Sequence, residues 1–115
     1  MSLDPTVTNP DLYRVVFEND RVRVLEYRDR PGMRSTRHSH PDSVMVTLSA
    51  FERRLHGDER VVDVTLEAGE ARWLPAQAHF GENIGATDSH ALFVELKDSS
   101  AGSGGALGPD ERQDR

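Results

Sequence analysis

Alternation of apolar and polar positions dominates the sequence between residues 11 and 97 and predicts strands rather than helices. Short runs rich in β-branched residues are separated by Gly, Pro, Asn and Asp, which is typical of strands joined by turns. The runs are YRVVF (13–17), RVRVLEY (21–27), MRSTRHSH (33–40), VMVTLSAF (44–51), a hairpin in ERRLHGDERVVDVTL (52–66), EAGEARWLP (67–75) and HALFVELK (90–97). No window of about eleven residues carries an apolar stripe at the helical period. About eight short strands at this spacing predict an all-β sandwich or barrel.

The strand pattern stops after Lys97, and this change divides the chain. The segment DSSAGSGGALGPDERQDR holds four of the nine glycines and no aromatic or β-branched residue, so it cannot bury enough apolar area to fold. A chain of 115 residues is otherwise of the length of one domain. We predict an N-terminal extension (1–10), a β-barrel domain (11–97) and a disordered Gly/Ser-rich tail (98–115).

Composition narrows the partners of this domain. The formal net charge is -6, and nucleic-acid binding draws its affinity from clustered basic residues, so we expect no nucleic-acid partner. No run approaches the ~20 apolar residues of a membrane span, and the N-terminus MSLDPTVTNPDLY has no basic or apolar signal region. We therefore expect a cytoplasmic protein without a membrane partner. The chain has no cysteine, so any metal must be held by His and carboxylates.

Candidate chemistry lies in the stretch GMRSTRHSHPDSV, which contains two of the five histidines. Side chains two positions apart in a strand share one face, so His38 and His40 are expected to point the same way, together with Arg34 and Thr36. Same-face neighbours are about 6.5 to 7 Å apart at the backbone, within reach of one ion. A metal site with open positions needs at least a third ligand, commonly a His or carboxylate of another strand.

Two motifs, in this order, resemble those of the cupin family. The first is a Gly, five residues and His-x-His, and it matches Gly32, His38 and His40. The second lies in GEARWLPAQAHFGEN (69–83), where the matching positions are Gly69, Pro75, His79 and Asn83. On this resemblance, which covers roughly residues 15–97, the chain is identified as a small single-domain cupin of the cupin 2 type. The resemblance implies a double-stranded β-helix, a jelly-roll-like barrel of two antiparallel sheets, and a homodimer.

The resemblance also implies a divalent metal ion (Fe, Mn, Zn or Ni) bound by His38, His40 and His79. The chain departs from the family where the first motif has its ligand Glu, because Ser43 or Val44 stands there. Three neutral imidazoles leave the full charge of the ion, which favours an anionic ligand or hydroxide. Arg34, expected on the histidine face, would then bind a substrate carboxylate or phosphate.

Two functions of different classes remain open on the sequence. One is an enzyme of dioxygenase, isomerase or lyase type acting on a small anionic organic molecule. The other is a non-catalytic module that binds or senses a small molecule, with or without metal.

Several side chains near the motifs also have two interpretations. His90 is either an inward-facing base or fourth ligand, or a residue at the barrel rim. Asp42 and Glu82 either orient the ligands or are loop carboxylates. Trp73 either walls a pocket or belongs to the core. The run YRVVF is predicted to pair across a two-fold axis in the homodimer.

Overall fold

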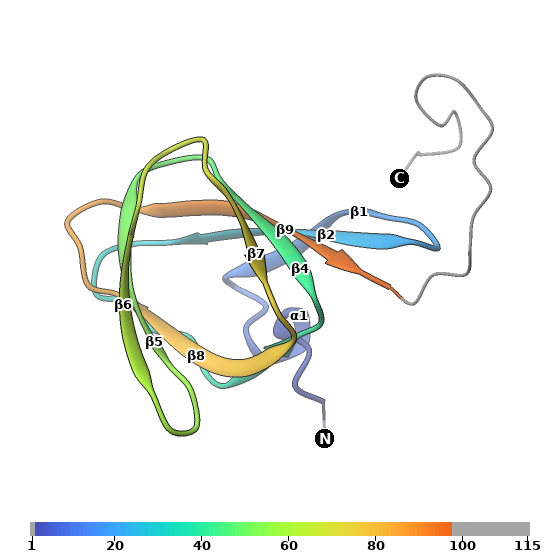
Figure 1. The fold of residues 1–115 in the computed structure, drawn as a ribbon, viewed down its shortest axis with the longest axis horizontal. Coiled ribbons are helices and arrows are strands. Elements are labelled where there is room, and N and C mark those ends of the chain that lie inside the picture. The colour runs from blue at the N-terminus through green and yellow to red at the C-terminus, as the bar shows by residue number, and fades with distance from the viewer. Residues whose placement is uncertain (1, 98–115) are drawn as a thin grey trace.

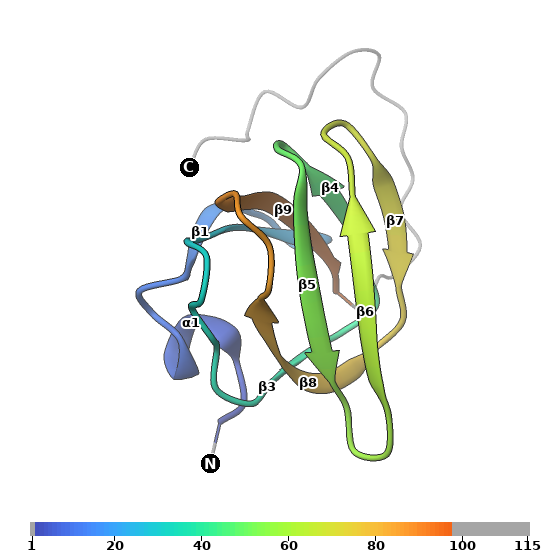
Figure 2. The same ribbon diagram turned by 90° about the vertical axis from the view of Figure 1, so that its left-hand side faces the viewer.

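Two antiparallel sheets enclose the interior of the protein, as Figure 1 and Figure 2 show. The computed structural model describes residues 2–97, and the strands within them form a five-stranded sheet, β1-β2-β9-β4-β7, and a four-stranded sheet, β3-β8-β5-β6. The elements are α1 (Pro5–Thr8), β1 (Tyr13–Glu18), β2 (Val22–Asp29), β3 (His38–His40), β4 (Ser43–Thr47), β5 (Phe51–His56), β6 (Val61–Leu66), β7 (Ala71–Leu74), β8 (Gln77–Asn83) and β9 (Ser89–Leu96). The predicted all-β barrel of two antiparallel sheets is confirmed.

The core lies between the sheets and is built by alternate residues of each strand. In β9 the buried positions are Ser89, Ala91, Phe93 and Glu95, while the intervening side chains are only partly buried. Aromatic rings from three strands meet inside, with the ring centroids of Tyr13 and Tyr27 4.7 Å apart and those of Tyr13 and Phe93 5.8 Å apart. This alternation leaves the inward polar side chains facing one shared interior.

Four features of the chain differ from the sequence-based expectation. The apolar run 44–51 is not one strand, because β4 ends at Thr47 and β5 begins at Phe51 in the other sheet. The run 33–40 is a strand only over 38–40; before it, Arg34 forms an isolated bridge to Glu82. Strand β8 and the helix α1 were not predicted. A four-residue helix is too short to show a helical period, and β8 has no continuous apolar alternation.

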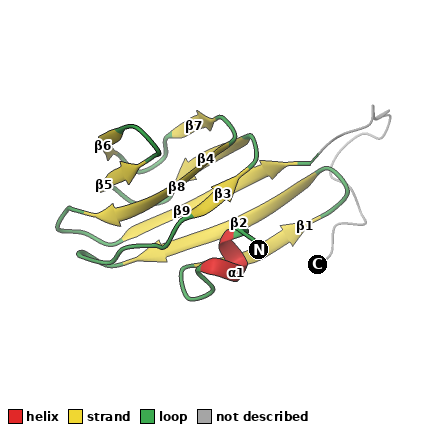
Figure 3. Ribbon diagram, turned by 90° about the horizontal axis from the view of Figure 1, so that it is seen from below, coloured by secondary structure: helices red, strands yellow, loops and turns green. Residues whose placement is uncertain are grey.

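Helix α1 closes one end of the barrel beside β3 (Figure 2), and Figure 3 shows it next to β1 and β2. Asp4 caps the helix by accepting a hydrogen bond from the Thr6 N–H (2.8 Å), and Pro5 stands at the first helical position. Asn9, which follows the helix, is buried and accepts a hydrogen bond from the Thr36 N–H (2.8 Å). The N-terminal residues thus position the segment that leads into β3.

The domain boundaries at residues 10 and 97 stay predictions, and the predicted tail 98–115 lies outside the described residues. Within residues 2–97, no helix is long and apolar enough to cross a membrane.

Candidate metal centre

The three histidines singled out in the sequence meet inside the barrel. His38 and His40 lie on β3, and His79 lies on the neighbouring strand β8, where it is the register partner of His38. All three are buried, and one ligand nitrogen from each lies within 4.8 Å of the other two. Two strands of one sheet therefore bring together residues separated by about forty positions in the chain.

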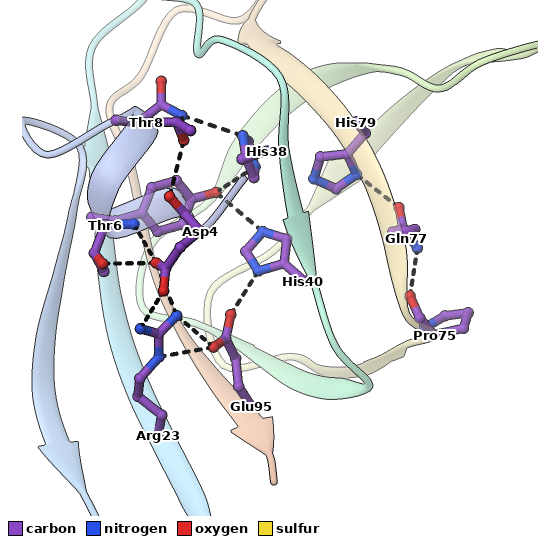
Figure 4. A network of polar contacts seen from close by, with 12 residues as sticks. Asp4, Thr6, Thr8, Arg23, His38, His40, Pro75, Gln77, His79 and Glu95 are labelled. Atoms are coloured by element: carbon purple, nitrogen blue, oxygen red, sulfur yellow. Dashed lines mark hydrogen bonds and ion pairs between the residues drawn. The ribbon is translucent and has the colours of Figure 1, made fainter. Parts of the chain in front are cut away.

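Each imidazole is held by a hydrogen bond from its Nδ1 atom, as Figure 4 shows in part. His38 Nδ1 lies 2.7 Å from the Thr36 carbonyl oxygen, His40 Nδ1 3.0 Å from Glu95 Oε2, and His79 Nδ1 2.7 Å from Gln77 Oε1. These three partners are acceptors, and the Thr36 oxygen lies closer to His38 Nδ1 than the Asn9 amide nitrogen does (3.4 Å), so each Nδ1 carries the proton and each Nε2 is left with its lone pair. This is the outer hydrogen-bond pattern typical of metal-bound histidines.

Burial keeps two of these histidines neutral. It lowers the pKa of His38 to about 4, although the hydrogen bond to Thr36 opposes the change. Burial, reinforced by the nearby His38 and His40, lowers the pKa of His79 to about 3. Neutral imidazole is the form that ligates metals, so both side chains are ready to act as ligands at neutral pH.

Tyr13 is a site residue that the sequence analysis did not identify. Its hydroxyl lies 3.2 Å from His38 Nε2 and 3.5 Å from His40 Nε2, on the side of the rings where the lone pairs point. Burial raises the pKa of Tyr13 far above its ordinary value, so the hydroxyl keeps its proton and donates to His38. Its only signal in the sequence is its place at the start of a predicted strand.

Glu95 brings a carboxylate next to the cluster, but not to the position of a metal ligand. Ser43, one of the two residues that can stand at the position of the family's Glu, is fully buried and pairs in register with Glu95 of β9, so both side chains face inward. The Ser43 hydroxyl is the one buried side-chain polar atom without a hydrogen-bond partner in residues 2–97. A small residue here leaves room for the Glu95 carboxylate, which contacts the Nδ1 side of His40 rather than the convergent Nε2 atoms.

A chain of charged contacts links Glu95 to the N-terminus (Figure 4). Arg23 Nη2 lies 2.9 Å from Glu95 Oε1, and Arg23 Nη1 lies 2.8 Å from Asp4 Oδ2. Glu95 therefore receives hydrogen bonds on both oxygens, which fixes the carboxylate and, through it, the ring of His40.

Arg34 does not join the histidines. Its side chain is exposed and lies over the ring of Phe80, with 4.8 Å from Cζ to the ring centroid. The predicted shared face is wrong, because Ser35 is buried while Arg34 and Thr36 are exposed, so the alternation shifts before His38. A role of Arg34 in substrate binding stays a prediction.

The other candidates also lie outside the cluster. His90 is half-buried, with Nε2 2.7 Å from Glu26 Oε2, which places it on the outer side of β9. Asp42 accepts a hydrogen bond from the Ala76 N–H, and Glu82 contacts His56. None of the three orients a histidine of the cluster.

A cavity of about 160 Å³ adjoins the cluster on the side of Tyr13 and His79. Its walls are largely apolar and include Phe51, Leu66, Ala91 and Phe93. Trp73, which lines the cavity, is 55% exposed, so the cavity opens toward solvent there. A small organic molecule in this space would lie next to the histidines.

Comparisons with known proteins agree on the architecture. No protein-family model and no curated protein matches the sequence. Among solved structures, a cupin domain from Bordetella pertussis is 28% identical with a TM-score of 0.71, covering 76% of this chain and 93% of its own. A conserved protein with a double-stranded β-helix domain from Klebsiella pneumoniae is 26% identical with a TM-score of 0.60, covering 74% of this chain and 75% of its own. The polyketide cyclase RemF from Streptomyces resistomycificus shares the fold alone, at 20% identity and a TM-score of 0.55 over 73% of this chain and 63% of its own.

Proposed function

Since the chain is a small cupin, we propose that it binds one divalent metal ion through His38, His40 and His79 and acts on a small anionic organic molecule in the adjoining cavity. One observation carries the proposal: three buried ligand nitrogens lie within 4.8 Å of one another. The acceptors at Nδ1 orient all three rings and leave the Nε2 lone pairs free.

The donor set fits a divalent first-row metal. Imidazole suits Fe, Mn, Zn and Ni, and three protein ligands leave open positions for water or substrate. Such an ion would polarise a substrate oxygen as a Lewis acid. Because all three ligands are imidazoles and none is a carboxylate, the bound ion keeps its whole charge, which supports an anionic ligand.

The residues around the cluster have distinct tasks in this proposal. The Tyr13 hydroxyl holds a proton beside the histidine nitrogens and is placed to donate it, as a hydrogen bond, to an oxygen of the bound molecule. Glu95 fixes His40, and the largely apolar walls of the cavity offer contacts to the apolar part of the ligand. Dioxygenation, isomerisation and elimination are the reaction types we place on this arrangement.

A second candidate function is a non-catalytic module that binds or senses the same class of molecule, with or without metal. The Tyr13 hydroxyl favours it, because that group already satisfies His38 Nε2 without an ion. A cluster satisfied in this way is stable in a metal-free barrel.

Elemental analysis by plasma mass spectrometry tests the proposal. The protein is purified without an affinity tag or added metal, and one portion is reconstituted with Fe, Mn, Zn or Ni. We expect close to one ion of a single metal per chain. Failure of every metal to bind, in both portions, would refute the metal site and favour the metal-free module.

Replacing Glu95 with glutamine is expected to weaken metal binding by about 10- to 100-fold, the usual cost of losing an outer hydrogen-bond partner of a ligand histidine. Glutamine keeps the size of the side chain but removes the charge that the His40 N–H contacts. Competition with a chelating dye measures the metal affinity. Glu82→Gln is the matched control, since Glu82 contacts His56 at 2.9 Å outside the cluster, and equal effects of the two variants would contradict the role of Glu95.

The homodimer and the cytoplasmic location stay predictions. Strand β1 is an edge of the five-stranded sheet, and its Val15 and Val16 are exposed, which is consistent with pairing across a two-fold axis. The expected lack of a nucleic-acid partner likewise rests on the net charge of -6.

A further inference from the structure

A buried guanidinium faces the cavity beside the histidines. Arg53 of β5 is the only buried arginine within residues 2–97, and it lines the cavity together with His79 and Tyr13. Its Nη1 atom donates to the Tyr27 hydroxyl (2.9 Å) and to Asp29 Oδ2 (2.8 Å). Neither the cluster nor the proposed chemistry accounts for this residue.

Two nitrogens of the Arg53 guanidinium remain available to a ligand. Among the described residues, Nε and Nη2 of Arg53 donate no hydrogen bond. The Ser43 hydroxyl is the one side-chain polar atom there that is fully buried and has no partner, so these two nitrogens are not fully buried. Both atoms therefore keep accessible surface. Because Arg53 lines the cavity and is only 8% exposed, that surface faces the cavity. An unpaired donor on a buried cation is costly unless a ligand or water completes it.

The guanidinium is held in a fixed position. Asp29, which it contacts, also accepts hydrogen bonds from Asn83 Nδ2 (3.0 Å) and the Ser89 N–H (3.3 Å). Gly81 of β8 lies beneath the guanidinium, where a Cβ atom would stand 2.2 Å from Arg53 Nη2. The absence of a side chain at Gly81 thus allows Arg53 to reach across β8 toward the histidines.

A second arginine, Arg72, lines the cavity at its exposed side and is paired with Glu70 at 2.6 Å, and the remaining surface is mainly apolar. The volume of the cavity, about 160 Å³, is close to that of an engineered apolar cavity of about 150 Å³ that binds benzene. The walls include Phe51, Leu66, Leu74 and Phe93. The space therefore suits an apolar group of about benzene size with one anionic head.

We propose that the ligand is a small monocarboxylate with an apolar group of about benzene size, and that Arg53 recognises its carboxylate. Nε and Nη2 form the planar fork that binds a carboxylate with two hydrogen bonds. Asp29 already balances the charge of Arg53, so a doubly charged head such as phosphate would face that carboxylate at close range. This inference rests on the proposed function only in placing the ligand in the same cavity.

Benzoate and its uncharged analogue benzamide test the inference on metal-free protein, prepared with a chelator. Trp73 is the only tryptophan and lines the cavity, so its fluorescence reports binding, with calorimetry as a second measurement. We expect benzoate to bind at least about tenfold more tightly than benzamide, because charge-assisted hydrogen bonds are about twice as strong as neutral ones. Acetate, which has the head without the ring, is expected to bind more weakly than benzoate. Equal affinities for benzoate and benzamide, or no binding of benzoate by either method, would overturn the inference.

Substitution of a glycine tests whether Arg53 causes the preference for benzoate over benzamide, and it leaves every charge of the protein in place. Gly81→Ala places a methyl group on Nη2 and is expected to abolish the preference for benzoate. Gly57→Ala is the matched control, because its Cβ would lie 3.7 Å from the nearest atom, the Arg60 carbonyl oxygen. A preference that survives in Gly81→Ala would refute the assignment to Arg53.

The outcome separates this inference from the proposed metal site. Benzoate preference in the metal-free protein, together with failure to bind metal, would refute the metal site and support the carboxylate site. One metal ion per chain, together with equal affinities for benzoate and benzamide, would support the metal site and refute the carboxylate site.

Discussion

Replacing His79 with alanine is expected to abolish metal binding, with an affinity loss greater than the about 100-fold that an outer hydrogen-bond partner can cost. The reason is geometric. His38 and His40 lie on one strand, and His79 alone supplies a ligand from the neighbouring strand. Without it, two imidazoles of β3 remain, and two ligands do not define a site with a fixed geometry.

Thermal unfolding with and without metal measures this effect. A metal that binds only the folded protein stabilises it by about 4 kcal/mol at a concentration 1,000 times its Kd. We expect the wild type to gain thermal stability on adding the metal and His79→Ala to gain almost none at the same concentration. His56→Ala is the control, because His56 contacts Glu82 outside the cluster. An unchanged metal response in His79→Ala would exclude His79 as a ligand.

The fold was predictable because the barrel is built from local signals. Strand alternation and Gly-containing turns recur along the chain, and each marks an element independently of the others. The missed division at residues 48–50 has a physical explanation. The apolar residues Leu48 and Ala50 lie where the chain leaves one sheet and enters the other, and both are exposed there although the sequence pattern continues through them. Hydrophobic pattern alone does not distinguish a corner from a strand.

The histidine cluster was predictable, whereas its surroundings were not. The three histidines stand in two motifs with characteristic spacing, and the structure brings them together. Tyr13 and Glu95 reach the cluster through the register of β1, β2 and β9, which no local pattern records. In HALFVELK, both faces carry apolar residues, so the sequence left open whether His90 points inward or lies at the barrel rim. The inward set is Ala91, Phe93 and Glu95.

Arg53 was missed for a similar reason. Arg53 stands beside Arg54 in the polar start of the predicted hairpin (52–66), where the simplest expectation is that both arginines are exposed to solvent. Only the pairing of β5 with β8 shows that one of them crosses over Gly81 into the interior. A buried ion pair between sequence-distant residues is a property of the assembled barrel rather than of either segment.

Asp29→Ala is expected to destabilise the protein by about 3 to 5 kcal/mol, the usual cost of leaving a buried charge without its partner. The side chain of Asp29 is fully buried, and the side chain of Arg53, its partner at 2.8 Å, is 10% exposed. The variant leaves the Arg53 charge uncompensated inside the barrel. It also removes the acceptor of hydrogen bonds from Asn83 and the Ser89 N–H.

The pH dependence gives this prediction a second measurement. Burial raises the pKa of Asp29, but hydrogen bonds from Tyr27, Ser89 and Asn83 and the charge of Arg53 outweigh it, so the pKa lies below its ordinary value. A carboxyl with a lowered pKa contributes stability that is complete above its unfolded value of about 4 and is lost as the pH falls further. Urea unfolding at pH 7 is therefore expected to show a large difference between wild type and Asp29→Ala, and the difference is expected to shrink in acid.

Asp63→Ala is the matched control for Asp29→Ala, because it breaks the pair that Asp63 forms with Arg54, the next residue along β5. That pair has similar distances, 2.8 and 3.0 Å, but both side chains are about half exposed, so water screens the charges. We expect a change in stability close to the error of the measurement. Comparable losses in the two aspartate variants would mean that the buried pair contributes no more than an exposed one, and the fixed position argued for Arg53 would lose its support.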